Sequence, residues 1–265
     1  MLLPLVLLAT APGGAGEPDA VAWLPRGSLA PVLVADPWQV RSDLALRRDF
    51  PSIGGQVGDR VAVVRVAWDG GAAEAGFAAG LHLGFVPADG FTFGIATVDG
   101  LLEVPATVAL GPLVFTVAWT HLSSHFADGV RYLDEPPEER SPHSREAVRA
   151  VVAWRGGWWS AYGGAREILH AVPEAPRPGI QAGASVEGPW RAAPFLALDG
   201  RWNADTGWYT GASLLAGLRV RGPGGRPLRA GLAAYRGPRV QGMLAEEDDA
   251  FVGAIVAFDP EEVLP

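Results

Sequence analysis

Three side chains near the middle of the chain have the types and spacing needed for nucleophilic catalysis. His121 and Ser123 are two residues apart in the apolar run 112–123, and Glu146 lies near the start of the next apolar run, 144–155. Residues two apart on a strand point to the same side, and residues opposite each other on paired antiparallel strands are about 5 Å apart. We therefore expect Ser123 as a nucleophile, His121 as its general base and Glu146 as the acid that orients the imidazole.

The elements that would position these groups are strands, because most of the chain alternates with a period of two. In residues 75–85, Ala, Phe and Leu occupy the odd positions, whereas Gly, Ala and His occupy the even ones. Strict alternation over about eight to twelve residues predicts β-strands that are longer than average. No segment shows a helical stripe. The twelve predicted strands are 59–68, 74–85, 91–98, 101–110, 112–123, 144–155, 158–168, 179–188, 190–200, 207–220, 226–236 and 249–258.

An even number of strands, with short turns on one side and long loops on the other, is typical of a transmembrane antiparallel β-barrel. The short turns are expected at 86–90, 111–112, 156–157, 188–189 and 221–226, and the longest loops at 124–143 and 237–248. We therefore predict an all-β fold, a barrel of about twelve strands with ten to fourteen possible. A soluble barrel or sandwich is the alternative, since alternation alone does not say which face is inside.

Charged residues on the polar face favour the membrane barrel over the soluble alternative. They alternate with glycine, as expected for a narrow lumen filled by paired charges, and they are Arg65, Glu74, Glu103, Arg145, Arg149, Arg155, Glu187 and Arg219. Tryptophans 154, 158 and 159 flank one short turn, which suits an aromatic girdle at a membrane interface. His82 is expected to be a packed polar residue that faces the lumen.

Composition excludes several classes of chemistry. The 265 residues include no cysteine and no lysine, so disulfides, thiolate nucleophiles, Schiff-base lysines and a Walker lysine are absent. The formal net charge of −8 argues against nucleic acid as a partner, because affinity for nucleic acid comes mainly from neutralising phosphates. The 35 glycines are about twice the usual share.

The chain divides into four predicted parts. Residues 1–16 combine an apolar run with small residues, as in a secretory signal peptide. Residues 17–56 are rich in Pro, Gly and Asp and are expected to form an N-terminal periplasmic segment or a plug. Residues 57–258 form the barrel, and residues 259–265 are a C-terminal tail. An exported protein without cysteine fits the bacterial envelope, and we expect it in the outer membrane.

Several stretches resemble a bacterial envelope family known only as domain of unknown function 1207. The resemblance lies in Leu24-Pro25, in Ala35-Asp36-Pro37, in the stretch from Thr120 to Asp128, in Ser144-Arg145-Glu146, and in the stretch from Trp159 to Gly164. It would cover residues from about 23 to 258. This family brings no activity with it.

The pair His121 and Ser123 also resembles the His-x-Ser pair of outer-membrane phospholipase A and of lipid A deacylase barrels. In those enzymes a side-chain amide or carboxylate on the following strand orients the histidine, and Glu146 matches that position here. Ser124 stands where those enzymes commonly have asparagine, which puts the oxyanion arrangement in doubt. The resemblance implies a lipid acyl-ester hydrolase whose partners are membrane lipids, either phospholipid or lipopolysaccharide.

The alternative is a non-enzymatic barrel with a structural, anchoring or narrow-pore role. In that case His121 and Ser123 are polar residues where a strand leaves the membrane, and Glu146 pairs with Arg145 or Arg131. Four more polar residues are expected in the loop or around the site, namely Ser124, His125, Asp128 and Ser144. No cofactor is expected, although the acidic loop offers oxygen ligands for Ca²⁺, which binds six to eight of them. These acidic residues are Asp128, Asp134, Glu135, Glu138 and Glu139.

Overall fold

The computed structural model describes residues 20–48, 53–89, 92–133, 143–221, 226–245 and 247–263. The predicted signal peptide, residues 1–16, therefore lies outside the described part. None of the helices in that part is long and apolar enough to cross a lipid bilayer. The helices among the described residues are three short 3-10 turns, η1 (Asp128–Tyr132), η2 (Ala204–Thr206) and η4 (Gly242–Leu244).

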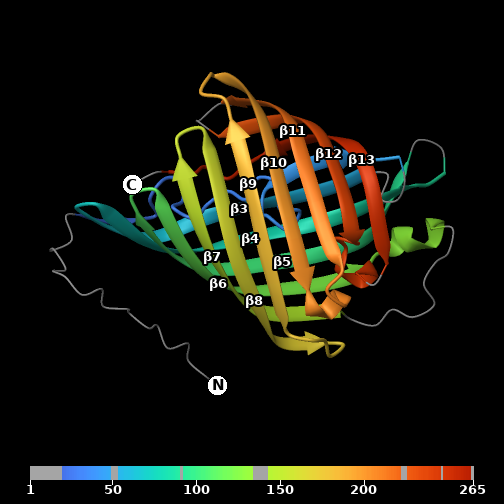
Figure 1. The fold of residues 1–265 in the computed structure, drawn as a ribbon. Coiled ribbons are helices and arrows are strands. Elements are labelled where there is room, and N and C mark those ends of the chain that lie inside the picture. Colours follow the sequence, from blue (N-terminus) through green and yellow to red (C-terminus); the bar gives the residue numbers. More distant parts are fainter. Residues whose placement is uncertain are drawn as a thin grey trace.

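Twelve strands, β2 to β13, pair with their neighbours in antiparallel order and close into a barrel (Figure 1), because β2 joins β13 to β3. A further strand, β1, pairs with the end of β3. The strands are β1 (Ala20–Trp23), β2 (Ser42–Leu46), β3 (Ile53–Trp68), β4 (Gly71–Pro87), β5 (Phe93–Leu110), β6 (Leu113–Phe126), β7 (His143–Gly156), β8 (Trp159–Val172), β9 (Pro178–Glu187), β10 (Ala192–Asn203), β11 (Thr210–Arg221), β12 (Pro227–Pro238) and β13 (Asp248–Phe258).

The predicted fold class is confirmed, but the twelve strands are not the twelve predicted segments. The segments 91–98 and 101–110 are one strand, β5. The number of barrel strands is still twelve because of β2, which lies within the range 17–56 that the sequence analysis places outside the barrel. β3 also begins in that range, at Ile53. The barrel wall therefore starts before residue 57.

Gly100 explains why β5 continues where the alternation suggests a break. Its backbone is extended rather than left-handed, and it pairs with Leu81 on β4 and with Ser123 on β6. One consequence is that the turn around 88–89 lies at the opposite end of the barrel from the turn at 111–112. The prediction that 86–90 belongs with the other short turns is wrong for this reason.

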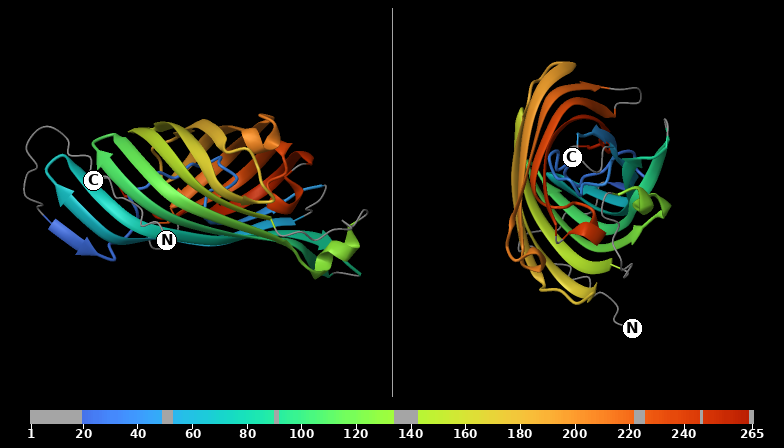
Figure 2. Two further views of the ribbon diagram at one scale, coloured as in Figure 1. Left: turned by 90° about the horizontal axis from the view of Figure 1, so that it is seen from below. Right: turned by 90° about the vertical axis from the view of Figure 1, so that its right-hand side faces the viewer.

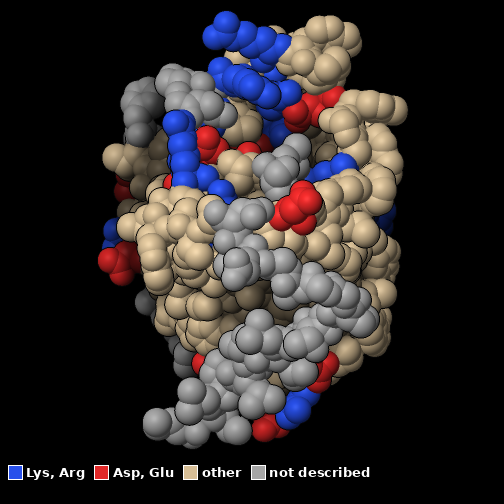
Figure 3. Space-filling model, turned by 90° about the vertical axis from the view of Figure 1, so that its left-hand side faces the viewer, with Lys and Arg blue, Asp and Glu red and all other residues tan. Residues whose placement is uncertain are grey.

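The two ends of the barrel differ. One, here called the short-turn end, carries the connections from β3 to β4, β5 to β6, β7 to β8, β9 to β10 and β11 to β12. The other, the long-loop end, carries η1, η2 and η4. Figure 3 shows the short-turn end, where charged groups of both signs gather in the upper half of the face. The hollow in its mouth is lined by Arg155, Glu187, Arg219, Arg229 and Glu262, among others.

The outside of the barrel is apolar over its whole circumference. Each strand from β3 to β13 presents at least one large apolar side chain that is more than two-fifths exposed, namely Val57, Leu81, Val104, Val117, Val152, Leu169, Ile180, Leu198, Leu218, Leu232 and Val252. The opposite parity points inward and is mostly polar or small, with some larger apolar residues such as Leu101, Phe195 and Leu215. Its charges are paired as predicted, for example Arg65 with Glu74 at 2.5 Å and Arg219 with Glu187 at 2.5 Å. This arrangement inverts that of a soluble protein and is the one a lipid environment favours.

The interior is filled by residues 24–41, here called the interior segment, which connects β1 to β2. It is seen inside the ring of strands in the right-hand view of Figure 2. Its apolar residues pack in three places against inward-facing apolar side chains of the wall: Leu29 against Ala109 and Val114, Val34 and Ala35 against Phe195 and Leu215, and Val40 against Ala78 and Leu101. The interior segment therefore completes three small apolar cores inside the barrel.

Wall arginines hold the backbone of the interior segment. Arg65 donates to the carbonyl oxygen of Gly27 at 2.8 Å, and Arg60 donates to that of Ala30 at 2.9 Å. A segment without regular structure leaves its carbonyl groups without partners, and buried carbonyls need them. Arginines of the wall therefore also satisfy backbone carbonyl groups of the segment that fills the lumen.

Asp36 makes the most buried ionic contact of the interior segment. Its side chain is fully buried and meets Arg201 of β10 and Arg149 of β7, the latter at 3.4 Å. Burial favours the neutral acid, but the two guanidinium groups outweigh it and hold the pKa of Asp36 below its usual value. Arg149 also binds Glu103 of β5 at 2.9 Å. One carboxylate thus ties the interior segment to two separate strands of the wall.

We expect Asp36→Asn to lower the free energy of unfolding by about 3 kcal/mol, because it leaves buried guanidinium groups short of a counter-charge. Urea unfolding in detergent micelles, followed by tryptophan fluorescence, measures the change. The control is Asp59→Asn, which breaks a more exposed ion pair with Arg226 and is expected to cost less than about 1 kcal/mol. Equal losses in the two variants would contradict the role given to Asp36.

Candidate functional site

The outer face of β6 carries a row of polar side chains at the long-loop end. Burial alternates along β6, so that Val114, Thr116, Ala118 and Ser124 are buried inside. The other parity faces outward, with Phe115 and Val117 exposed near the short-turn end. The same parity carries Trp119, His121, Ser123 and His125. The expectation that His121 and Ser123 lie on the outer wall near the rim therefore agrees with the alternation in the structure.

His121 meets the carboxylate of Glu146. The two residues are opposite each other in the register of β6 and β7, and His121 Nδ1 lies 3.6 Å from Glu146 Oε1. The imidazole also stacks on Trp119, with ring centroids 6.1 Å apart and planes 19° from parallel. The side chains of His121 and Glu146 are both more than a third exposed. The structure thus brings together the histidine and the acid expected from the sequence.

Ser123 makes its hydrogen bond with a different histidine. Its Oγ lies 2.8 Å from Nε2 of His125, two residues further along the same face. No hydrogen bond joins Ser123 to His121 among the described side chains. His125 was expected in the loop 124–143, but β6 continues to Phe126, so that His125 belongs to the strand.

The remaining candidates are divided between the two faces. Ser144 is opposite Ser123 in the register of β6 and β7. Ser124 points inward and is fully buried, opposite Asp99 of β5. Asp128 is exposed at the start of η1. Of the acidic residues considered for Ca²⁺, those from Asp134 to Glu139 lie outside the described residues, and no cluster in the described part has metal-ligand geometry.

An apolar hollow lies on the outer wall beside Ser123. It has a volume of about 460 Å³ and is bordered by His121 and Ser123 on one side. The apolar side chains around it come from β3, β4 and β5 and include Val57, Ala79, Leu81 and Leu102. Gly100 lies directly opposite Ser123 and has no side chain to fill the space. A Cβ added at Gly100 would lie 3.7 Å from the Ser123 carbonyl oxygen and 3.9 Å from Leu81, which are ordinary contacts.

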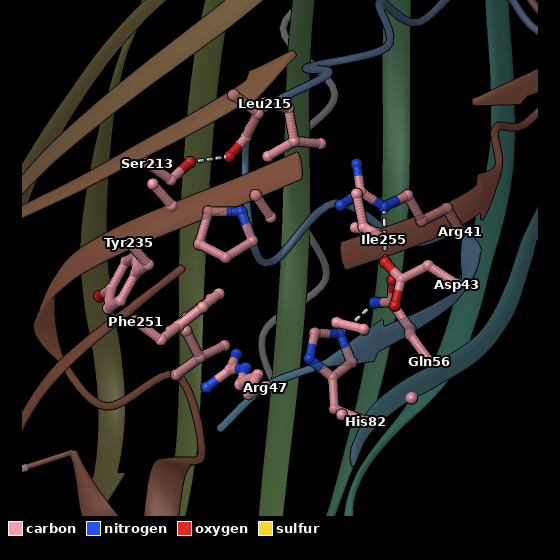
Figure 4. A pocket seen from close by; sticks show the side chains of 18 of the residues that line it. Arg41, Asp43, Arg47, Gln56, His82, Ser213, Leu215, Tyr235, Phe251 and Ile255 are labelled. Carbon is pink, nitrogen blue, oxygen red and sulfur yellow. Dashed lines mark hydrogen bonds and ion pairs between the residues drawn. The ribbon is translucent and has the colours of Figure 1, made fainter. Parts of the chain in front are cut away.

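A second, smaller cavity lies inside the barrel and is shown in Figure 4. Its volume is about 90 Å³. Most of its polar side chains already have partners: Arg41 binds Asp43 at 2.7 Å, and His82 contacts Gln56. His82 also packs against the ring of Trp38, with centroids 5.7 Å apart. The prediction that His82 is a packed polar residue is confirmed, and this cavity offers no free chemical group comparable to Ser123.

Two residues of the outer site fall outside the predicted strands. Gly100 lies between the predicted segments 91–98 and 101–110, although it lines the hollow. His125 falls in the predicted loop 124–143, because the predicted strand ends at Ser123. The parity that places Ser123 on the outside extends without change to His125, so continuing the strand by one pair of residues is enough to find it.

Comparisons with known proteins support the architecture. No family model matches the chain, and no curated protein sequence matches it, so the resemblance to domain of unknown function 1207 stays a prediction. Among solved structures, the fold is similar to outer membrane phospholipase A from Escherichia coli, with a TM-score of 0.54 and 10% sequence identity. The match covers 88% of this chain and 94% of that one. An active-site mutant of the same enzyme, with asparagine changed to alanine, matches equally well.

The division between the two faces of β6 can be tested with single cysteines, since the chain has none of its own. We expect Ser123→Cys to react with a lipid-soluble maleimide in folded protein, because its side chain faces outward. We expect Ser124→Cys to react only after unfolding, because that side chain is fully buried. The cysteine-free parent shows the background. Equal labelling of both positions in the folded protein would contradict the assigned faces.

Proposed function

We propose that the protein is an outer-membrane lipid acyl-ester hydrolase with Ser123 as its nucleophile. One observation carries the proposal: the Ser123 hydroxyl is on the apolar outer wall, hydrogen-bonded to an imidazole and beside an apolar hollow. A serine and an imidazole in contact are the basis of acyl transfer. On this wall their substrate is a membrane lipid, either a phospholipid or lipid A.

The site contains the parts that ester hydrolysis needs. An imidazole takes the Ser123 proton while Oγ attacks the carbonyl carbon of the ester. Besides the histidine bonded to Ser123, the face carries His121, whose ring is placed against the Glu146 carboxylate. The ester's acyl chain lies in the hollow, where Leu81 and Leu102 cover it. The similarity to outer membrane phospholipase A supports the barrel fold, whereas the activity rests on these residues.

Location in the outer membrane is supported by the apolar exterior and by aromatic side chains at the short-turn end. Trp154 and Trp159 are each 41% exposed and stack with ring centroids 6.4 Å apart. Trp158, in the turn between β7 and β8, is 63% exposed. Tryptophan is enriched where a barrel meets the lipid headgroups. The histidines and serine at the other end of β6 would then lie near the headgroups of the outer leaflet, where ester bonds are found.

The filled interior argues against an open pore. Asp36 and the apolar residues of the interior segment occupy the lumen between β7 and β10. A barrel with a purely structural or anchoring role would share this interior, and it would have no use for a paired serine and histidine on its lipid-facing wall. Activity measurements therefore distinguish the two functions better than conductance does.

We expect Ser123→Ala to lower fatty-acid release about a thousandfold or more, because the acyl-enzyme step is lost. Purified protein in mixed micelles is assayed separately with phospholipid and with lipid A, with and without Ca²⁺. The control is Ser160→Ala, a serine near the short-turn end whose hydroxyl contacts Ser185. If the wild type releases no fatty acid from either lipid, the hydrolase proposal fails and the non-enzymatic barrel takes its place.

We expect Gly100→Leu to slow hydrolysis of long-chain esters about tenfold, because the new side chain displaces roughly two methylene groups of the acyl chain from the hollow. A short-chain ester that does not reach the hollow is expected to react at the wild-type rate. Gly100→Ala serves as the matched control, since the contacts of an added Cβ are ordinary. Equal slowing of both esters would mean that the acyl chain lies elsewhere.

A further inference from the structure

One serine lies between two histidines on the outer face of β6. His121 precedes Ser123 by two residues and His125 follows it by two, and all three share one parity. The sequence alone favours His121 as the base, because Glu146 is available to orient it. The contacts are distributed differently, since Glu146 meets His121 whereas Ser123 bonds to His125.

We propose that His125 is the general base that activates Ser123, and this proposal rests on the function proposed above. The separation of 2.8 Å between Ser123 Oγ and His125 Nε2 is within the range needed for proton transfer. Nδ1 of His121 faces Glu146 and its ring stacks on Trp119, whereas the hydrogen bond of Ser123 goes to His125. His125 is also the more exposed of the two histidines, which suits a base that must meet a lipid headgroup at the rim.

The reaction balances with water as the second reactant. The Ser123 proton moves to His125 Nε2 as Oγ bonds to the ester carbonyl carbon. The bond from that carbon to the alcohol oxygen then breaks, and the alcohol leaves with the proton from His125. Water next loses a proton to His125 and attacks the acyl-serine, which releases the fatty acid and returns the proton to Ser123.

Other ionisable groups on this part of the wall come from β7 and β8, and the exposed Asp128 at the start of η1 follows His125 by three residues. Glu146 is opposite His121 on one side and His170 of β8 on the other. Glu167, also on β8, is exposed opposite Val148 of β7. On β5, the partner of His125 is the apolar Val98. His125 thus has only Ser123 as a hydrogen-bonding partner among the described residues.

The test uses three histidine variants, His125→Ala, His121→Ala and His170→Ala. His170→Ala is the matched control, because it also removes an outward imidazole next to Glu146. Heat-modifiable gel migration first establishes that each variant forms the barrel. We expect His125→Ala to lower kcat for lipid hydrolysis about a hundredfold or more, with partial rescue by added imidazole. We expect His121→Ala to keep a larger share of kcat, and His170→Ala to match the wild type.

A second readout does not depend on knowing the lipid. An alkyl fluorophosphonate phosphonylates an activated serine: the bond from Ser123 Oγ to phosphorus forms, fluoride leaves, and the proton goes to the base. We expect the labelling rate of the wild type to fall at low pH as the imidazole is protonated. In His125→Ala this dependence disappears and labelling is slow at every pH, whereas His121→Ala retains it.

The results separate the base assignment from the proposed function. In one outcome Ser123→Ala is inactive, His121→Ala loses both the activity and the pH dependence of labelling, and His125→Ala keeps both. The base is then His121, so our inference is overturned while the proposed hydrolase function stands. If the wild type neither hydrolyses lipid nor is labelled at Ser123, the hydrolase and its base assignment fall together. If His125→Ala loses lipid hydrolysis and the pH dependence of labelling, and His121→Ala retains them, the results support both the hydrolase function and His125 as the base.

Discussion

The closed ladder of backbone hydrogen bonds is the constraint on which the rest of the structure depends. In lipid, an unpaired amide or carbonyl has no water to bind, so a sheet must close on itself. Closure fixes one face of every strand toward the outside of the barrel and the other toward the lumen. With a side-chain period of two, the position of a residue along its strand then decides its environment. Ser123 and Ser124 differ by one position, and one is on the outer wall while the other is fully buried.

The inner face of the wall combines small and charged residues with some large apolar ones, such as Leu101, Phe195 and Leu215. Leu29, Val34 and Val40 of the interior segment pack against this face. Asp36 supplies a negative charge where the arginines of β7 and β10 converge. Arg149 also pairs with Glu103 and Arg201 with Asp199, so the buried ion pairs join wall strands to one another as well as to the interior segment.

Alternation predicts the barrel and the inward charges, and it places His121 and Glu146 on the same outer face, because these follow from parity. It does not predict where a strand ends. Gly100 falls between two predicted segments, but an extended glycine paired on both sides continues a strand without strain. The five residues of β2 are too few to show a period. The partner of Ser123 depends on side-chain rotamers, which no pattern in the sequence specifies.

The shortness of β2 has a consequence for how the barrel is held closed. β2 makes five register pairs with β13 and four with β3, whereas β12 and β13 share eleven. It is also the direct continuation of the interior segment. The strand that closes the ring and the segment that fills it are therefore one continuous stretch, residues 24–46. The wall strand with the fewest register pairs is held from inside by the packing of Val40 against Ala78 and Leu101.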